Sequence, residues 1–114
     1  MNLDLIINFC ETLPGATAIM KIEDHLTYNV GGKSFIWFGQ DQVPVTCSFK
    51  SSEEDFDALS SREGFVPAPY MARNKWIQCQ DIGLLTRPEM ETYVLRSYQI
   101  IRSKLPRKVQ NTLA

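Results

Sequence analysis

Residues 26–39 are LTYNVGGKSFIWFG, the stretch that decides the fold. Leu26 to Val30 and Ser34 to Gly39 are rich in aromatic and β-branched residues, which favour strands. Gly31-Gly32-Lys33 separates them, and glycine reaches the positive φ angles of a tight turn without a Cβ penalty. Because Ser34 to Gly39 is apolar on both faces, we expect a central strand covered by helices on at least one side.

The pattern continues as strands on both sides of this hairpin. Ala18 to Ile22 is the strand expected before it. Val43 to Phe49 alternates apolar and polar residues, which is typical of a strand with one wet face. Lys75 to Asp81 alternates in the same way and predicts a further strand, with Ile77 and Cys79 on one face and Trp76 and Gln78 on the other. Phe65 to Asn74 contains two prolines and is expected to be a loop.

Helices are predicted at both ends of the chain. An apolar stripe at three-to-four spacing between Leu3 and Leu13 predicts the first helix. Ser51 and Glu54 fit a capping box that would open a short second helix. Thr86 and Glu89 fit another, at the start of the longest helix.

Strands grouped between terminal helices predict an α+β fold in which an antiparallel β-sheet is packed on one face by the N-terminal and C-terminal helices. The chain of 114 residues, 44% hydrophobic, has the size and composition of one folded domain spanning 1–114. No apolar run approaches the roughly 20 residues of a membrane helix. The N-terminus lacks the basic start of a signal peptide, so a cytoplasmic location is expected.

Catalytic and metal-binding motifs are not evident. The chain has three cysteines, Cys10, Cys47 and Cys79, and their odd number and wide spacing argue against a disulfide framework or a zinc site. We predict that they are buried thiols. His25 is the single histidine, too little for a fixed metal site. We therefore expect no enzyme activity, no metal and no cofactor.

Charge is distributed unevenly along the chain. The net charge is −1, but residues 1–72 carry −6 and residues 73–114 carry +5. Such charge asymmetry favours a polyanion partner. Two alternatives stay open. The two halves could interleave in space, which would cancel the asymmetry, and basic side chains near the C-terminus of a helix also complement the helix dipole. The candidate nucleic-acid-binding residues are Arg73, Lys75, Trp76, Arg96, Arg102, Lys104, Arg107 and Lys108.

The ordered motifs resemble a known family. Leu13-Pro14-Gly15 ends the first helix, Val30 to Phe35 reads VGGKSF, and Lys104-Leu105-Pro106 ends the last helix. With Tyr70, Lys75-Trp76 and Arg96-Ser97-Tyr98 at their spacings, this set is similar to the MmcQ/YjbR family over nearly the whole chain. The resemblance implies a fold like that of the frataxin homologue CyaY and a DNA-binding role.

Three functions remain open from the sequence. The first is DNA binding by the basic residues of the C-terminal half. The second is a protein-interaction or regulatory domain without nucleic-acid binding, using the open sheet face at Thr46, Ser48, Trp76 and Gln78 or the loop from Pro67 to Tyr70. The third, ranked last because no catalytic set accompanies it, is a small-molecule site near Tyr70 and Trp76.

Overall fold

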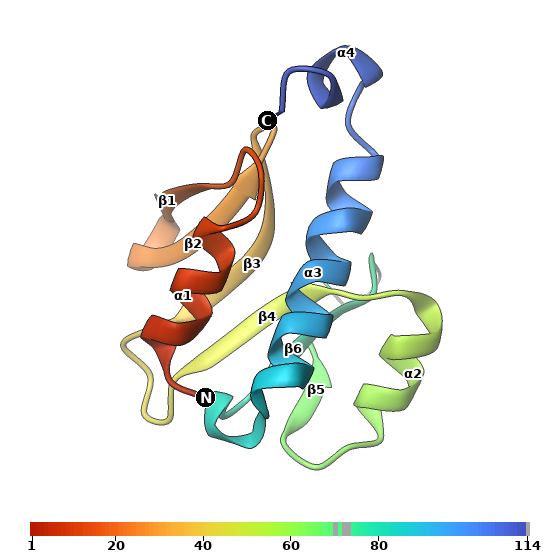
Figure 1. Ribbon diagram of the computed structural model, residues 1–114. Coiled ribbons are helices and arrows are strands. Elements are labelled where there is room, and N and C mark those ends of the chain that lie inside the picture. The colour runs from red at the N-terminus through yellow and green to blue at the C-terminus, as the bar shows by residue number, and fades with distance from the viewer. Residues whose placement is uncertain (70, 72–73, 114) are drawn as a thin grey trace.

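A computed structural model describes residues 1–69, 71 and 74–113. Its six-stranded antiparallel sheet has the order β1-β2-β3-β4-β6-β5, so the predicted α+β class is confirmed (Figure 1). The strands are β1 Thr17–Lys21, β2 His25–Val30, β3 Lys33–Gly39, β4 Thr46–Lys50, β5 Phe65–Pro67 and β6 Trp76–Cys79. The helices are α1 Leu3–Glu11, α2 Glu53–Ser60, α3 Arg87–Ser103 and α4 Arg107–Gln110, with short 3₁₀ turns η1 Ile22–Asp24 and η3 Ile82–Leu84.

The β2–β3 hairpin contains a register shift that determines which side chains face the helices. Tyr28 pairs with Ile36 but Asn29 pairs with Ser34, so Phe35 is an extra residue on β3. Such a bulge lets two successive side chains point the same way. Phe35 and Ile36 therefore both face the core, and Trp37 points to the opposite face.

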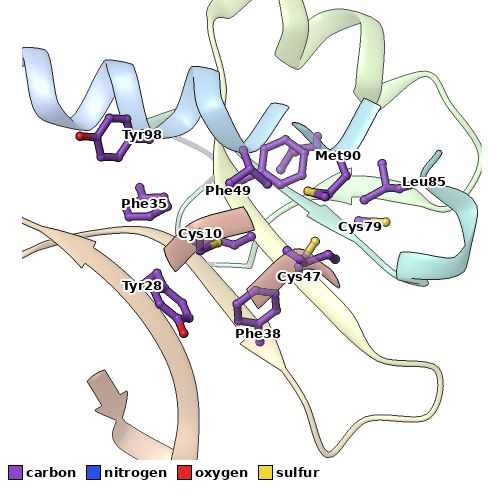
Figure 2. Packing of buried hydrophobic residues seen from close by; sticks show 14 of the residues in the cluster. Cys10, Tyr28, Phe35, Phe38, Cys47, Phe49, Cys79, Leu85, Met90 and Tyr98 are labelled. Carbon is purple, nitrogen blue, oxygen red and sulfur yellow. The ribbon is translucent and has the colours of Figure 1, made fainter. Parts of the chain in front are cut away.

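The covered face of the sheet packs against α1 and α3, which lie on the same side in Figure 1. The ring of Phe35 meets Tyr98 edge-on at 5.4 Å, and Phe49 stacks on Tyr93 at 5.8 Å. Figure 2 shows Phe35, Phe38, Phe49 and the three cysteines within one apolar cluster. Ser97 of α3 is buried there and donates a hydrogen bond to the carbonyl oxygen of Phe35 at 2.5 Å.

Side chains of the open face are identified by strand register. Trp37 pairs with Ser48, and Ser48 pairs with Gln78, so these three share one face with Thr46, two residues before Ser48. Within the described part of the chain, α1 and α3 pack on the other side of the sheet, and α2 lies against β5 and β6 at its edge. Among the described residues, the open face is therefore bordered by short segments and is not covered by α1, α2 or α3.

Helix starts confirm one predicted capping box and correct the other. Thr86 accepts a hydrogen bond from the backbone of Glu89, whose carboxylate accepts one from the Thr86 backbone. The prediction at Ser51 is wrong by one residue, because Ser52 is the N-cap and accepts from Asp55 N. Ser51 is buried and instead bonds to the carbonyl oxygen of Lys75.

Prolines explain two differences from the predicted strands. The expected loop begins with the short strand β5, because Pro67 ends an edge strand, where a missing ladder donor is tolerated. The strand predicted from Val43 begins only at Thr46. Val43 is almost fully exposed, and Pro44 has no N–H to donate to a ladder.

Buried thiols are confirmed for all three cysteines. Cys47 and Cys79 lie opposite each other on β4 and β6, facing the helices. Burial raises the pKa of the Cys10 thiol to about 12. None of the helices described here combines the length and apolarity needed to cross a bilayer.

Candidate functional site

Four lysines from four separate segments meet at one end of the sheet. Lys33 begins β3, Lys50 ends β4, Lys75 directly precedes β6 and Lys104 caps the C-terminus of α3. Burial lowers the pKa of the Lys50 ammonium, and the nearby positive charges of Lys104 and Lys75 lower it further. We call these four residues the lysine cluster. In the part of the chain that the structure describes, none of them forms an ion pair with a carboxylate.

Local backbone contacts position the members from the middle of the chain. Lys75 has a φ of 63°, a left-handed conformation that costs a non-glycine residue about 1–2 kcal/mol. Ser51 stabilises it by donating both its N–H, at 2.9 Å, and its hydroxyl, at 2.8 Å, to the Lys75 carbonyl oxygen. The ammonium of Lys75 lies 5.0 Å from the centre of the Phe56 ring, and the ammonium of Lys50 donates to the carbonyl oxygen of Asn74. The two charges are therefore held by the protein.

An apolar groove of about 400 Å³ lies beside the lysine cluster. Its walls come from β3, from the segment leading into β6, and from the end of α3. Two of the four lysines, Lys33 and Lys104, line it directly. The other lining residues are Ser34, Trp37, Met71, Trp76, Ile101, Leu105 and Pro106. We call this concavity the lysine groove.

Gly31 fixes how the end of α3 meets the hairpin. Its φ is +57°, and a Cβ there would lie 2.5 Å from Cδ1 of Leu105. Glycine is therefore needed both for the turn and for the close approach of Leu105. This contact brings the wall formed by α3 against the start of β3, where Lys33 lies.

Trp37 joins the lysine groove to a second hollow, of about 420 Å³, on the open face. Thr46, Ser48 and Gln78 line this second hollow, and Met71 is shared by both concavities. The Trp37 side chain is half-buried, with the His25 ring tilted against it at 5.9 Å between centroids. On the open face, the Trp37 ring therefore lies between the lysine groove and the second, more polar hollow.

Two of the predicted arginines are used by intramolecular contacts. Arg96 donates to both carboxylate oxygens of Asp55, at 3.1 and 2.9 Å. Arg102 donates to the Tyr98 hydroxyl at 2.8 Å and lies over the same ring. Neither residue lines the lysine groove, so the eight predicted residues do not form one surface.

The remaining predicted residues divide into three groups. Lys75, Trp76 and Lys104 belong to the lysine cluster or its groove. Arg107 and Lys108 are exposed on α4, directly after Pro106 at the groove wall. Arg73 lies outside the described residues, as does Tyr70 of the predicted contact loop.

Sequence reasoning missed Lys33 and Lys50, which belong to the acidic half of the chain. A count of charge by halves of the chain hides them, because β3 pairs with β4 and β4 pairs with β6 only in the folded sheet. In the alternation that begins at Val43, Lys50 follows Phe49 at the predicted strand end, and this is the signal in the sequence that could have found it.

Comparison with known proteins assigns the family. The YjbR family model matches residues 11–100, which include every strand and most of α3. The chain belongs to the YjbR family. No curated protein matches it.

Two crystal structures are similar in fold to this YjbR domain. The Deinococcus radiodurans protein DR2400, with a DUF419 domain, superposes with a TM-score of 0.86 at 17% identity, covering 96% of this chain and 86% of that one. A Pseudomonas syringae protein gives a TM-score of 0.70 at 18% identity, covering 89% and 99% respectively. At these identities the likeness extends to the fold alone. The proposed likeness to CyaY stays a prediction.

Catalytic chemistry is not evident among the residues described in this YjbR domain. They contain no group of three or more His, Cys, Asp or Glu that could hold a metal ion. The pKa of Cys47 is raised, chiefly by its contact with Cys79 and by burial. His25 contacts the Phe38 carbonyl oxygen through Nδ1, at 2.9 Å. The arrangement at the lysine groove is instead suited to binding an anion that carries an apolar or aromatic part.

Proposed function

We propose that this YjbR domain is a non-enzymatic nucleic-acid-binding module that uses the lysine cluster and the lysine groove. The observation that carries the proposal is the environment of Lys50. Its ammonium lies close to those of Lys75 and Lys104, and no salt bridge to a carboxylate is found for it among residues 1–69, 71 and 74–113. Because like charges repel, a bound anion would stabilise this arrangement.

Nucleic acid fits the site better than a simple anion does. Lysines neutralise backbone phosphates, and aromatic faces stack on bases. The lysine groove brings Lys33 and Lys104 together with Trp37 and Trp76. A phosphate and a base, one step apart on the same strand, match this pairing of charge and apolar wall.

A purely structural role, such as pairing with a helix dipole, explains only part of the lysine cluster. A cation at the end of α3 complements the helix dipole, which accounts for Lys104. Lys50 and Lys75 are on no helix, and each is half-buried. Lys75 also adopts a left-handed backbone conformation that a glycine would take at lower cost. These costs support a binding role.

The test is fluorescence anisotropy of labelled oligonucleotides over a range of salt concentrations. Counterion release predicts a slope of log affinity against log salt of up to about −3 for four phosphate contacts on a single strand. Lys104→Gln is expected to make the slope shallower by about 0.7. Lys21→Gln, which makes the same charge change on β1 at the far edge of the sheet, is the matched control and should leave it unchanged. Absence of binding at low salt, or equal effects of the two variants, would refute the proposal.

A second candidate function is self-association through β1, a protein-interaction role. β1 is an edge strand of five residues without proline, whereas the opposite edge, β5, has three residues and ends at Pro67. Ile19 and Met20 on β1 are 42% and 56% exposed. A long apolar edge strand can pair with another chain, and β1 of a second copy is the occupant we propose.

Sedimentation equilibrium tests this candidate. Wild-type protein is expected to dimerise, and Met20→Lys is expected to be monomeric because charge on an edge strand opposes pairing. Wild-type protein that remains monomeric at high concentration would eliminate the candidate and leave the nucleic-acid proposal untouched.

A further inference from the structure

Beyond a general affinity for nucleic acid, we propose that the domain is selective for single strands, with one unpaired base seated in the lysine groove against Trp37. This inference rests on the proposed function and specifies its substrate class. The strand would continue from the groove across the open face, over Ser48 and Gln78. These contacts set neither the polarity nor the base sequence of the bound nucleic-acid strand.

The shape of the site favours a single strand over a duplex. Proteins that read duplex DNA insert a protruding helix or ribbon into a groove of the DNA. Here Lys33 and Lys104 line a concavity, and its volume of about 400 Å³ is at the small end for a ligand site. A duplex keeps its bases stacked inside and could touch only the rim lysines. An unpaired base can leave the strand and enter.

The chemistry of the lining agrees with this choice. Six of the side chains on the groove wall are apolar or aromatic: Trp37, Met71, Trp76, Ile101, Leu105 and Pro106. Such a surface contributes nothing to contacts with a phosphate backbone. It contributes to stacking and to burial of a base, both of which tolerate any sequence.

Trp37 is the ring best placed to contact the base. Trp76 is only 6% exposed, so it forms part of the wall. Trp37 is half-buried and belongs to both hollows. Tilted contact with His25 on one side and pairing with Ser48 across the sheet keep it on the open face. Its position resembles that of the sheet aromatics with which other open-faced sheets stack single-stranded bases.

Beyond Trp37, the second hollow offers polar groups for the continuing strand. Ser48 and Gln78 lie side by side on β4 and β6, and Thr46 is two residues from Ser48. Hydroxyl and amide groups can bond to either base edges or sugars. The lysine cluster lies only at the groove end, so the phosphate contacts should be few and local.

The experiment compares three 12-nucleotide probes by anisotropy: a mixed-sequence single strand, the corresponding duplex, and an abasic single strand with the same number of phosphates. We expect the single strand to bind at least ten-fold more tightly than either of the others. Trp37→Leu keeps an apolar side chain but removes the aromatic face. It should weaken single-strand binding about 5- to 150-fold and leave the abasic probe unchanged.

Two further measurements keep the test decisive. Trp37→Phe retains a ring and is expected to bind the single strand more tightly than Trp37→Leu. Leu5→Ala, at an exposed apolar position of α1 on the covered side of the sheet, is the control that should bind as wild type does. In wild-type protein, the single strand should protect tryptophan fluorescence from acrylamide quenching. This measurement does not depend on whether any variant folds.

The outcomes separate the two levels of the proposal. Equal or tighter duplex binding, with no effect of Trp37→Leu but loss of affinity in Lys104→Gln, would overturn the single-strand inference and preserve nucleic-acid binding. Failure of all three probes to bind at low salt would overturn both.

Discussion

Phe38 and Trp37 are neighbours on β3 and lie on opposite faces of the same sheet. Phe38 is 1% exposed and contacts the apolar cluster beneath α1 and α3, whereas Trp37 is half-buried between two hollows. The covered face has its polar groups satisfied internally, as Ser97 does for Phe35. The open end of the sheet carries lysines without carboxylate partners in the described residues. The covered face therefore supplies stability, and the open face is the surface for which we propose a ligand.

The largest expected effect concerns the cysteines of the covered face. In native buffer, thiol-specific labelling of Cys10, Cys47 and Cys79 should be more than about a thousand-fold slower than in urea, because labelling requires opening of the core. The raised pKa values of Cys10 and Cys47 oppose thiolate formation as well. Rapid native labelling would show that the covered face is accessible.

Substitution of the two neighbouring aromatics should separate the faces directly. Phe38→Ala is expected to lower the free energy of unfolding by about 3–5 kcal/mol, the usual cost of truncating a buried aromatic. Trp37→Ala should cost clearly less, because its ring is partly in water already. Urea denaturation measures both. Equal losses would mean that Trp37 is a core residue unavailable to a ligand.

Ser97→Ala tests the internal satisfaction of the covered face. The hydroxyl donates to the Phe35 carbonyl and accepts from Lys50 N, at 2.9 Å. Its removal should lower the free energy of unfolding by about 1–3 kcal/mol, because buried polar groups lose their partners. Ser103→Ala, on the exposed end of the same helix, is the control and should change stability by less than about 0.5 kcal/mol.

A charge pair at the start of α3 provides the smallest effect. Arg62 donates to Glu89 at 2.5 Å, which lowers the pKa of that carboxyl. Its contribution should be present above the unfolded pKa of about 4.3 and lost as the pH falls through the lower folded pKa. Because both side chains are about one-third exposed, we expect no more than about 1 kcal/mol.

Denaturation of Glu89→Gln at pH 7 and pH 3 checks this sign. The variant should be less stable than wild type at pH 7 and nearly equal to it at pH 3. Glu91→Gln, at a looser pair with Arg87 of 3.7 Å, should differ little from wild type at either pH. A larger difference at pH 3 than at pH 7 would contradict the assignment.

The sequence predicted the fold better than it predicted the site, and the reason is the range of the interactions. The Thr86–Glu89 capping box spans four residues, and the alternation in β4 and β6 is local, so both could be recognised from the sequence. The bulge at Phe35 and the N-cap shift from Ser51 to Ser52 depend on partners elsewhere in the fold.

The candidate site could not be predicted as a whole from the sequence, because its residues come together only in the folded sheet. Arg96 and Asp55 are 41 residues apart, and their pairing removes one predicted binding residue. Lys50 was counted with an acidic half of the chain, yet sheet order places it beside Lys75. A charge asymmetry along the sequence therefore turned into a lysine cluster drawn from both halves.

The most direct test of a ligand-binding open face is an amide and indole chemical-shift map of the ¹⁵N-labelled protein titrated with a single-stranded oligonucleotide. We expect shifts of the Trp37 indole N–H and of the amides of Lys33, Lys50 and Ser48, with little change in α1 and β1. Shifts concentrated on α1 or β1, or no shifts at low salt, would contradict it.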